Sequence, residues 1–222
     1  MPGHCHFCLE RRDDVLPWCF SCHQLLAYNL HPCPRCAEPV PISAVGPCGH
    51  CLSTPPLFER ALVPFLYQNE IALLIHSFKF HADMRAGRLL LMLLLHALHE
   101  PPTFLRHCAL IPVPLHDKRA KQRGFDQADW LARHLARRLH VPMYHARRIK
   151  DTPSQRGLKR KERLKNIRHA FTFDSALPSH VVLFDDVMTT GATFDALAHA
   201  CRDAGAKHIG VLALARTPPG AH

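Results

Sequence analysis

The residues best suited to chemistry lie in the last third of the chain, where two acids are followed by a cluster of threonines. The stretch VVLFDDVMTTGAT spans Val181–Thr193. Its apolar start predicts a strand over Val181–Phe184, followed by a short loop over Val187–Ala192 and a helix over Gly191–Ala204. In open α/β sheets, ligands bind at the carboxyl ends of strands, and a helix N-terminus offers free N–H groups to an anion. The pattern therefore predicts a phosphate site.

The side chains of this stretch narrow the expected ligand. Threonine hydroxyls donate hydrogen bonds and a glycine lets the backbone approach closely, so the phosphate cradle is assigned to Met188, Thr189, Thr190, Gly191, Ala192 and Thr193. Asp185 and Asp186 would repel a phosphate, but they can accept hydrogen bonds from sugar hydroxyls near a bound Mg²⁺. Together these groups indicate a ribose 5-phosphate. The alternative is an ordinary strand–helix turn with an Asp/Thr cap; no GxxxxGK[ST] or GxGxxG motif is present.

Four CxxC pairs dominate the N-terminal quarter, with 10, 10 and 11 residues between them. Two CxxC turns complete a tetrahedral site of four sulfurs, so eight cysteines predict two structural zinc ions. Redox chemistry is the alternative, although one CxxC would suffice for it. Which pairs share an ion stays open. The expected ligands are Cys5, Cys8, Cys19, Cys22, Cys33, Cys36, Cys48 and Cys51.

Alternating strand-like and helix-like segments follow the cysteines. Ser53–Pro56 marks a boundary, which divides the chain into a cysteine domain over residues 1–54 and a larger domain over residues 55–222. The alternation predicts an α/β fold with a mostly parallel sheet covered by helices on both faces. Strands are expected at Ala61–Tyr67, Cys108–Val113, Val181–Phe184 and Ile209–Leu214, and helices at Glu70–Phe80, Met84–His99, Gln127–Leu139, Arg160–Arg168 and Gly191–Ala204.

Charge and hydropathy limit the class of protein. Lysine and arginine number 28 against 18 acids, a net charge of +10, which favours polyanionic partners or phosphorylated substrates; a solvated basic surface is the alternative. No apolar run reaches the ~18–20 residues that span a bilayer, so membrane insertion is not expected. The first residues contain no apolar signal segment, and a cytoplasmic location is expected.

The stretch Val181–Thr193 resembles the motif with which type I phosphoribosyltransferases bind phosphoribosyl pyrophosphate (PRPP). The whole chain resembles the ComF family (ComFC/GntX-like competence proteins), on its four CxxC pairs and on PCPRC, HSFKFH, IPVPLH, RGFDQ, DTPSQRGL and LALART. The resemblance runs from Cys5 to Thr217. It implies a type I phosphoribosyltransferase-like domain behind a double zinc ribbon, with PRPP and Mg²⁺ as ligands.

The resemblance also implies roles for residues outside the threonine cluster. The loop after the Cys108–Val113 strand would hold the pyrophosphate, with Pro114, Leu115, His116, Lys118, Arg119, Arg123 and Lys79 as candidates. Asp126 stands where the family commonly has asparagine, and we interpret it as the N-cap of the next helix. The segment Asp151–Asn166 resembles the family's mobile loop. Its basic residues suit a single-stranded nucleic acid as well, with Arg156, Arg160, Lys161 and Arg163 as candidates.

The expected function is that of a PRPP-binding protein in natural transformation, which contacts incoming single-stranded DNA or a DNA-uptake helicase. Two alternatives remain: a metabolic phosphoribosyltransferase with a small acceptor, and a non-catalytic module that senses PRPP. If the protein is an enzyme, an acceptor nitrogen displaces pyrophosphate at C1 of the ribose, with Asp185 and Asp186 as its catalytic residues. The sequence identifies no acceptor pocket.

Overall fold

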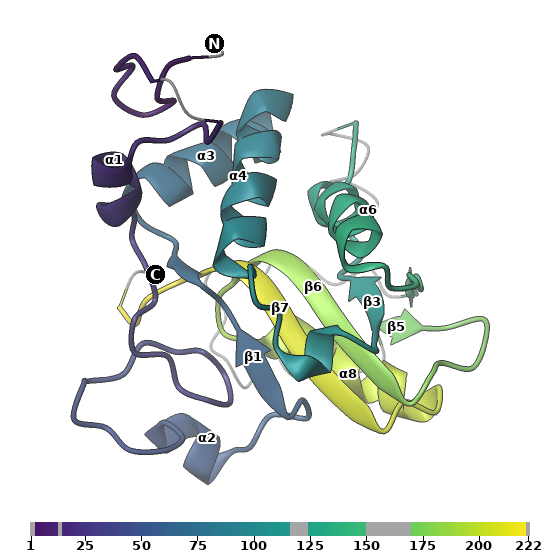
Figure 1. Ribbon diagram of the computed structural model, residues 1–222. Helices are drawn as coiled ribbons and strands as arrows, with labels where there is room; N and C mark the ends of the chain where they lie inside the picture. The colour runs from purple at the N-terminus through teal and green to yellow at the C-terminus, as the bar shows by residue number, and fades with distance from the viewer. Residues whose placement is uncertain (1–2, 13–14, 116–123, 150–169, 221–222) are drawn as a thin grey trace.

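The core of the molecule is a mostly parallel sheet, seen in a computed structural model that describes residues 3–12, 15–115, 124–149 and 170–220. Neighbouring strands run in the order β1–β7–β6–β3, all parallel, and β2 extends the β1 side by pairing with the far end of β7. The central strands β6 and β7 are the longest (Figure 1). The strands are β1 Arg60–Leu62, β2 Phe65–Leu66, β3 Ala109–Pro112, β6 His180–Met188 and β7 His208–Arg216.

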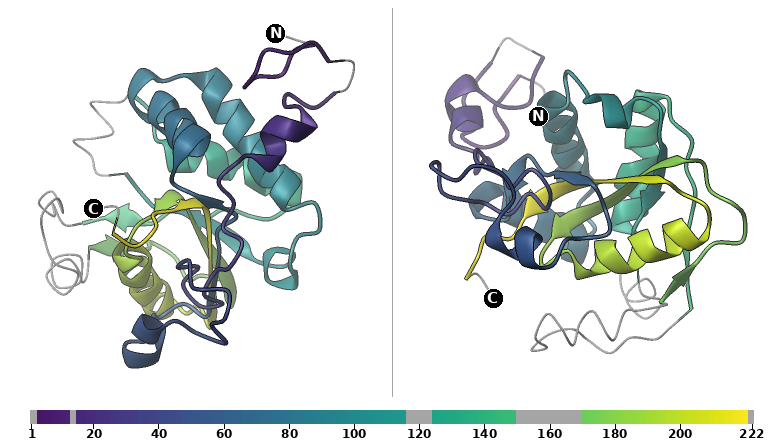
Figure 2. Two further views of the ribbon diagram at one scale, coloured as in Figure 1. Left: turned by 90° about the vertical axis from the view of Figure 1, so that its left-hand side faces the viewer. Right: turned by 90° about the horizontal axis from the view of Figure 1, so that it is seen from below.

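Helices cover both faces of this sheet (Figure 2). One layer holds α3 (Asn69–His81), α4 (Met84–Ala97) and α6 (Gln127–Leu139), and the other holds α8 (Ala192–Asp203). Alternate residues of a strand point to opposite faces. Leu110, Val182 and Leu212 accordingly pack with the three-helix layer, whereas the alternate strand residues Ile111, Leu183 and Val211 pack with α8. The sheet is therefore buried on both sides, as its continuous apolar strands require.

Smaller elements complete the described part of the chain. The cysteine segments contain two one-turn helices, and a short antiparallel pair of strands lies beside the sheet (Figure 1). These elements are α1 Phe20–Gln24, α2 Gly49–Ser53, the 3-10 turn η1 Thr103–Leu105, β4 Arg147–Arg148 and β5 Phe171–Thr172. No described helix combines the length and the apolar character that crossing a bilayer demands.

The predicted α/β architecture with helices on both faces is confirmed, and the helix Gln127–Leu139 has the predicted bounds. Two strand predictions are wrong in extent. The strand predicted to end at Phe184 continues to Met188, because β7 pairs with it as far as Arg216. The single strand predicted over Ala61–Tyr67 is two short strands. Pro64 lies between them, and a proline has no N–H for the ladder. The helix predicted over Arg160–Arg168 lies outside the described residues.

Candidate ligand site and cysteine clusters

The two acids lie on β6 itself, past the point where its neighbour β3 ends. Pro112, the last residue of β3, is paired with Phe184. The next link is the N–H of Val113, which donates to the carbonyl of Phe184 at 2.8 Å. Asp185 and Asp186 therefore lie at the carboxyl edge of the sheet, beside the chain that leaves β3. This edge is the place where parallel sheets bind ligands.

Asp186 forms a buried ion pair with a helix of the three-helix layer. Asp186 is 4% exposed, and its Oδ1 lies 2.8 Å from Nζ of Lys79. Lys79 belongs to the last turn of α3, which ends at Ala82 in a left-handed conformation. A buried carboxylate needs such a partner, because burying an unpaired charge costs roughly several kcal/mol. The sequence did not predict this pair; it proposed Lys79 for pyrophosphate instead.

Asp185 lies in a less favourable electrostatic position. Burial of its surroundings and the neighbouring Asp186 carboxylate raise the pKa of Asp185 well above its usual range, against the opposing effect of Lys79. Its Oδ1 accepts a hydrogen bond from the N–H of Asp186 at 2.8 Å. The two ionised acids and one lysine would leave an excess negative charge. A cation or a set of hydroxyl donors can compensate that charge, which agrees with the chemistry predicted for this pair.

The threonine cluster forms the turn from β6 to α8. Gly191 is the N-cap of α8 and has a φ of 79°, a left-handed conformation that glycine adopts without strain. A Cβ at this position would also lie 3.0 Å from the Met188 side chain. The N–H of Ala192 lies 3.4 Å from Oγ1 of Thr190. The first turn of α8 thus directs its N–H groups toward the same edge as the two acids.

The segment after β3 is held by the helix that follows it. The N–H of Leu115 donates to Asp126 Oδ2 at 3.0 Å, and Asp126 Oδ1 accepts from the N–H of Asp129 at 3.0 Å. Asp126 is the N-cap of α6, as predicted, and it also anchors the start of the proposed pyrophosphate loop. Of that loop the structure describes Pro114 and Leu115; the remaining candidates, His116, Lys118, Arg119 and Arg123, lie outside the described residues, as do the nucleic-acid candidates Arg156, Arg160, Lys161 and Arg163.

The eight paired cysteines form two groups of four, each built from neighbouring CxxC pairs. In each group the four sulfurs lie within 4.8 Å of one another, and either group could hold a metal ion. Across the pairs, the Sγ atoms of Cys8 and Cys19 lie 3.8 Å apart, and those of Cys36 and Cys48 lie 3.6 Å apart. The structure thus answers the question of pairing in favour of adjacent pairs. We name the groups module 1 (residues 5–22) and module 2 (residues 33–51).

The electrostatics of both modules favour a bound cation. Burial raises thiol pKa values, but backbone N–H groups directed at the first cysteine of each module outweigh this effect. The pKa of Cys5 falls to about 6 and that of Cys33 to about 7. Burial and the neighbouring sulfurs raise the pKa of Cys36 to about 11, and they also raise those of Cys22 and Cys51. Ionisation of all four cysteines of a module would therefore need a positive ion among the sulfurs. Cys108 and Cys201 are buried elsewhere in the larger domain.

Known proteins resemble this chain over nearly its whole length. It is 31% identical to "Competence protein F" of Haemophilus influenzae, with 96% of this chain and 90% of that protein covered. It is 34% identical to "DNA utilization protein YhgH" of Escherichia coli O157:H7, with 98% of each covered. The chain belongs to the ComF family.

Two more distant similarities are found beside these relatives. "Competence protein ComFC" of Bacillus subtilis is 27% identical over 84% of this chain and 78% of that protein. No family model matches the chain. Among solved structures, an orotate phosphoribosyltransferase from Aeropyrum pernix is similar with a TM-score of 0.42 and 23% identity, covering 64% of this chain and 66% of that one.

One residue of this ComF-family chain was missed as part of the site. Arg216, the last residue of β7, is 3% exposed and donates to the carbonyls of Met188 and Thr189 at the start of the threonine turn. It also reaches module 2, through the Cys36 carbonyl at 3.3 Å and Glu38 Oε2 at 3.2 Å. The sequence signal was the closing LALART motif, which supported the family resemblance without suggesting a role.

Proposed function

We propose that this protein binds PRPP with Mg²⁺ at the carboxyl edge of its sheet. The observation that carries the proposal is the joint presence of two carboxylates and a helix N-terminus. Asp185 and Asp186 lie near the carboxyl end of β6, and the threonine turn leads directly into α8. A ribose 5-phosphate needs acceptors for its hydroxyls beside donors for its phosphate, and this edge supplies both within one short stretch.

In this proposal each part of the edge has one task. Asp185 and Asp186 accept the ribose hydroxyls, and the turn from Met188 to Thr193 binds the 5-phosphate. The loop that begins at Pro114 and Leu115 binds the pyrophosphate, with Mg²⁺ neutralising its charge. The further candidates for pyrophosphate binding are Lys79, His116, Lys118, Arg119 and Arg123. Lys79 would have to divide its positive charge between Asp186 and the ligand.

We propose zinc as the ion of both cysteine modules. Zn–S bonds of about 2.3 Å place the sulfurs of a tetrahedral site about 3.8 Å apart. The distances of 3.8 Å in module 1 and 3.6 Å in module 2 fit that geometry. With all four positions taken by cysteine, these sites are structural. Cysteines that bind zinc in place of forming disulfides are typical of a reducing compartment, which supports a cytoplasmic location.

We place this activity in natural transformation or DNA use. Relatives that share 31% and 34% of their residues with this chain are named a competence protein and a DNA utilization protein. The net charge of +10 suits a polyanion, and single-stranded DNA or a DNA-uptake helicase is the proposed partner. The basic candidates for DNA are Arg156, Arg160, Lys161 and Arg163.

Two outcomes of PRPP binding are compatible with this geometry. In the first, an acceptor nitrogen attacks C1 of the ribose and pyrophosphate leaves; the protein contributes positioning and charge neutralisation. In the second, PRPP is an effector that reports nucleotide supply to the DNA-uptake apparatus. Release of pyrophosphate during a screen of nucleobases and small amines decides for transfer, and its absence in a protein that binds PRPP decides for an effector.

Titration calorimetry with PRPP and Mg²⁺ tests the shared core of the proposal. We expect binding by the wild type and none by the Asp185→Asn/Asp186→Asn double variant. Asp203→Asn is the matched control, because Asp203 is an exposed acid at the opposite end of α8. A folded wild-type protein that fails to bind PRPP at millimolar concentration contradicts the proposal.

The role in DNA use has its own test. A gel shift with single-stranded DNA should decrease with salt and should disappear when Arg160, Lys161 and Arg163 are neutralised. A deletion strain complemented with the Asp185→Asn/Asp186→Asn variant should remain deficient in transformation. Full transformation by that variant would separate the biological role from PRPP binding.

A further inference from the structure

The two cysteine modules repeat the same local structure. In module 1 the N–H of Cys5 donates to Glu10 and the N–H of Leu9 donates back to Cys5; in module 2 the same bonds join Cys33 to Glu38 and Ala37 to Cys33. Leu9 and Ala37 both have positive φ. Glu10 and Glu38 thus occupy equivalent positions, five residues after the first cysteine. Any functional difference between the modules must come from what lies around them.

The surroundings differ at these glutamates. Glu10 is exposed, whereas Glu38 accepts a hydrogen bond from the buried guanidinium of Arg216 at 3.2 Å. The same guanidinium donates to the Cys36 carbonyl at 3.3 Å, and Cys36 is a ligand candidate of module 2. One side of Arg216 is therefore fixed by the turn that closes around the second metal position.

The other side of Arg216 is fixed by the threonine turn (residues 188–193), which we name the phosphate turn after its proposed ligand. Its Nη1 donates to the carbonyls of Met188, at 3.1 Å, and of Thr189. A third link, from the N–H of Thr217 to the Met188 carbonyl at 3.0 Å, holds the same peptide. The C=O and N–H of a trans peptide point in opposite directions. Arg216 therefore turns the N–H groups of Thr189 and Thr190 away from itself.

This orientation is what an anion site at the turn requires. With the carbonyls of Met188 and Thr189 bound by Arg216, their negative ends point away from the incoming phosphate and the following N–H groups are free to meet it. A buried guanidinium has a high desolvation cost that only a well-formed set of acceptors offsets. Its planar fork with several donors can reach carbonyls on both sides, which the single ammonium of a lysine cannot do.

We propose that Arg216 is a positioning residue for the phosphate turn, and that it makes PRPP binding depend on the metal of module 2 and not on the metal of module 1. This inference rests on the proposed function, because it concerns the same anion site. The metal fixes the Cys33–Glu38 turn, the turn fixes Arg216, and Arg216 fixes the peptide planes that face the 5-phosphate. Module 1 contains the same turn, but the hydrogen bonds described for Arg216 go to module 2, to the carbonyls of Met188 and Thr189, and to Thr217.

Matched pairs of variants test this dependence in the full-length protein. Arg216→Met and Cys33→Ser/Cys36→Ser should each weaken PRPP binding by about tenfold or more in calorimetry, performed well below the melting temperature. Arg216→Lys should be impaired almost as much as Arg216→Met, because the charge alone does not hold two carbonyls. Cys5→Ser/Cys8→Ser is the control and should bind PRPP within about twofold of the wild type. Zinc content is measured for each protein.

Hydrogen exchange of the backbone gives a readout that does not depend on PRPP. The amides of residues 188–193 should exchange faster in Arg216→Met and in the module 2 variant than in the wild type, and at the wild-type rate in the module 1 variant. If the module 2 variant does not fold, Arg216→Lys and Glu38→Gln decide, with Glu10→Gln as the control for Glu38.

The outcomes separate this inference from the proposed function. If the wild type binds PRPP and the Arg216 and module 2 variants bind it equally well, the inference is wrong and the proposed function stands. If the wild type does not bind PRPP, the proposed function fails. The amide exchange rates of residues 188–193 then still decide whether Arg216 and module 2 fix the conformation of the turn. Equal weakening by both cysteine variants would show a general loss of stability and would also overturn the inference.

Discussion

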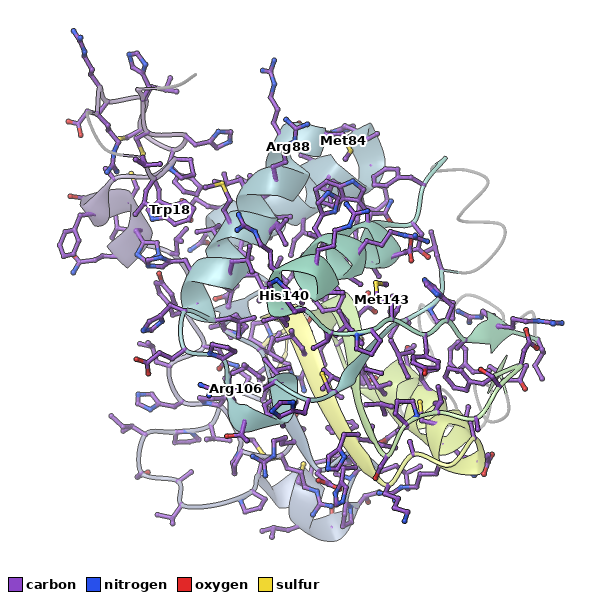
Figure 3. The ribbon with its side chains drawn as sticks, turned by 45° about the vertical axis from the view of Figure 1, so that its right-hand side comes forward. Trp18, Met84, Arg88, Arg106, His140 and Met143 are labelled. Carbon is purple, nitrogen blue, oxygen red and sulfur yellow. The ribbon has the colours of Figure 1, made fainter. Side chains whose placement is uncertain are left out.

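The two cysteine modules are alike in sequence and local structure but pack on opposite faces of the sheet. Cys5 and Trp18 of module 1 belong to the core of the three-helix layer, where Trp18 meets His96 of α4 with ring centroids 5.6 Å apart. Figure 3 shows Trp18 between the first cysteine segment and this layer. Cys33 and Cys51 of module 2 belong to the core of the α8 layer. Only the α8 layer includes the helix that begins at the phosphate turn.

If Arg216 acts as proposed, one small motif serves two purposes in this protein. Both modules contain too few apolar residues for a core of their own, so each joins a core that the larger domain provides. Module 1 extends the helical side and adds stability there. Module 2 reaches the carboxyl edge of the sheet, where its carbonyl and carboxylate groups meet Arg216. The role of each module therefore depends on the part of the larger domain that it packs against, and not on the cysteine motif itself.

The largest expected effects come from removing the metal of either module. Cys5→Ser/Cys8→Ser and Cys33→Ser/Cys36→Ser should each cost about 4 kcal/mol or more of unfolding free energy, since loss of a structural metal is among the severest changes. Thermal unfolding measures this loss. Trp18 fluorescence should shift to the red in the module 1 variant alone, because Trp18 packs beside that module.

The controls for this first prediction are a cysteine and a tryptophan that lie elsewhere. Cys108→Ala should retain the full zinc content, because Cys108 is a buried residue next to β3 and belongs to neither module. Trp130 on α6 contributes an emission that neither module should change. A red shift of equal size in both cysteine variants would contradict the separate packing of the modules.

A smaller effect is expected at Lys79, which lies on α3 in the three-helix layer that module 1 joins. Lys79→Met leaves Asp186 buried without its ion-pair partner and should cost about 2–4 kcal/mol, less than a fully buried pair because Lys79 retains some exposure. Adding Asp186→Asn should restore most of that loss, and exposed Lys207→Met should cost almost nothing. Chemical unfolding measures all four proteins. A loss in Lys79→Met that Asp186→Asn does not relieve would point to a different role for Lys79.

Asp185→Asn is expected to stabilise the protein, in contrast to the changes above. The pKa of Asp185 is raised in the folded protein, so its ionised form destabilises that state above its unfolded pKa of about 3.9. Asp185→Asn should therefore raise the melting temperature at pH 7 by about 2–4 °C, the shift that corresponds to 1 kcal/mol in a chain of this size. Below about pH 4 the wild-type acid is protonated in both states and the difference should vanish.

Combining Asp185→Asn with each cysteine variant compares the two modules, with the change in melting temperature as the readout. The gain should persist in Cys5→Ser/Cys8→Ser, because module 1 does not adjoin the site. The same substitution should weaken PRPP binding strongly. A melting temperature that falls at pH 7 would show that the Asp185 carboxylate stabilises the folded state.

The smallest effect distinguishes the equivalent glutamates. Glu38→Gln removes the charge opposite Arg216 and should cost about 1 kcal/mol, whereas Glu10→Gln should change stability by less than about 0.5 kcal/mol. Thermal unfolding of the two variants side by side gives the difference. Equal effects would mean that the Arg216 contact adds nothing to the stability of module 2.

Much of the site was predictable because its parts are local in sequence. The acids, threonines and Gly191 lie within nine consecutive residues, Asp185–Thr193, so a strand–turn–helix pattern was enough to group them. Asp126 was likewise predicted as an N-cap from its position before an amphipathic stretch. Lys79 and Arg216 could not be assigned in this way. Lys79 meets Asp186 across 107 residues of sequence, and Arg216 meets Glu38 across 178.

The sequence by itself determined the local units: which cysteines form CxxC turns, which stretches alternate between strand and helix, and where an anion can meet a helix N-terminus. These follow from spacing, apolar periodicity and hydrogen-bonding capacity within short segments. Only the tertiary structure decided which cysteine pairs share a site, how far β6 extends, and which module touches the phosphate turn. Those outcomes depend on packing between segments that are distant in sequence. Two copies of one motif have the same local sequence pattern, so that pattern cannot determine which face of the sheet each copy packs against.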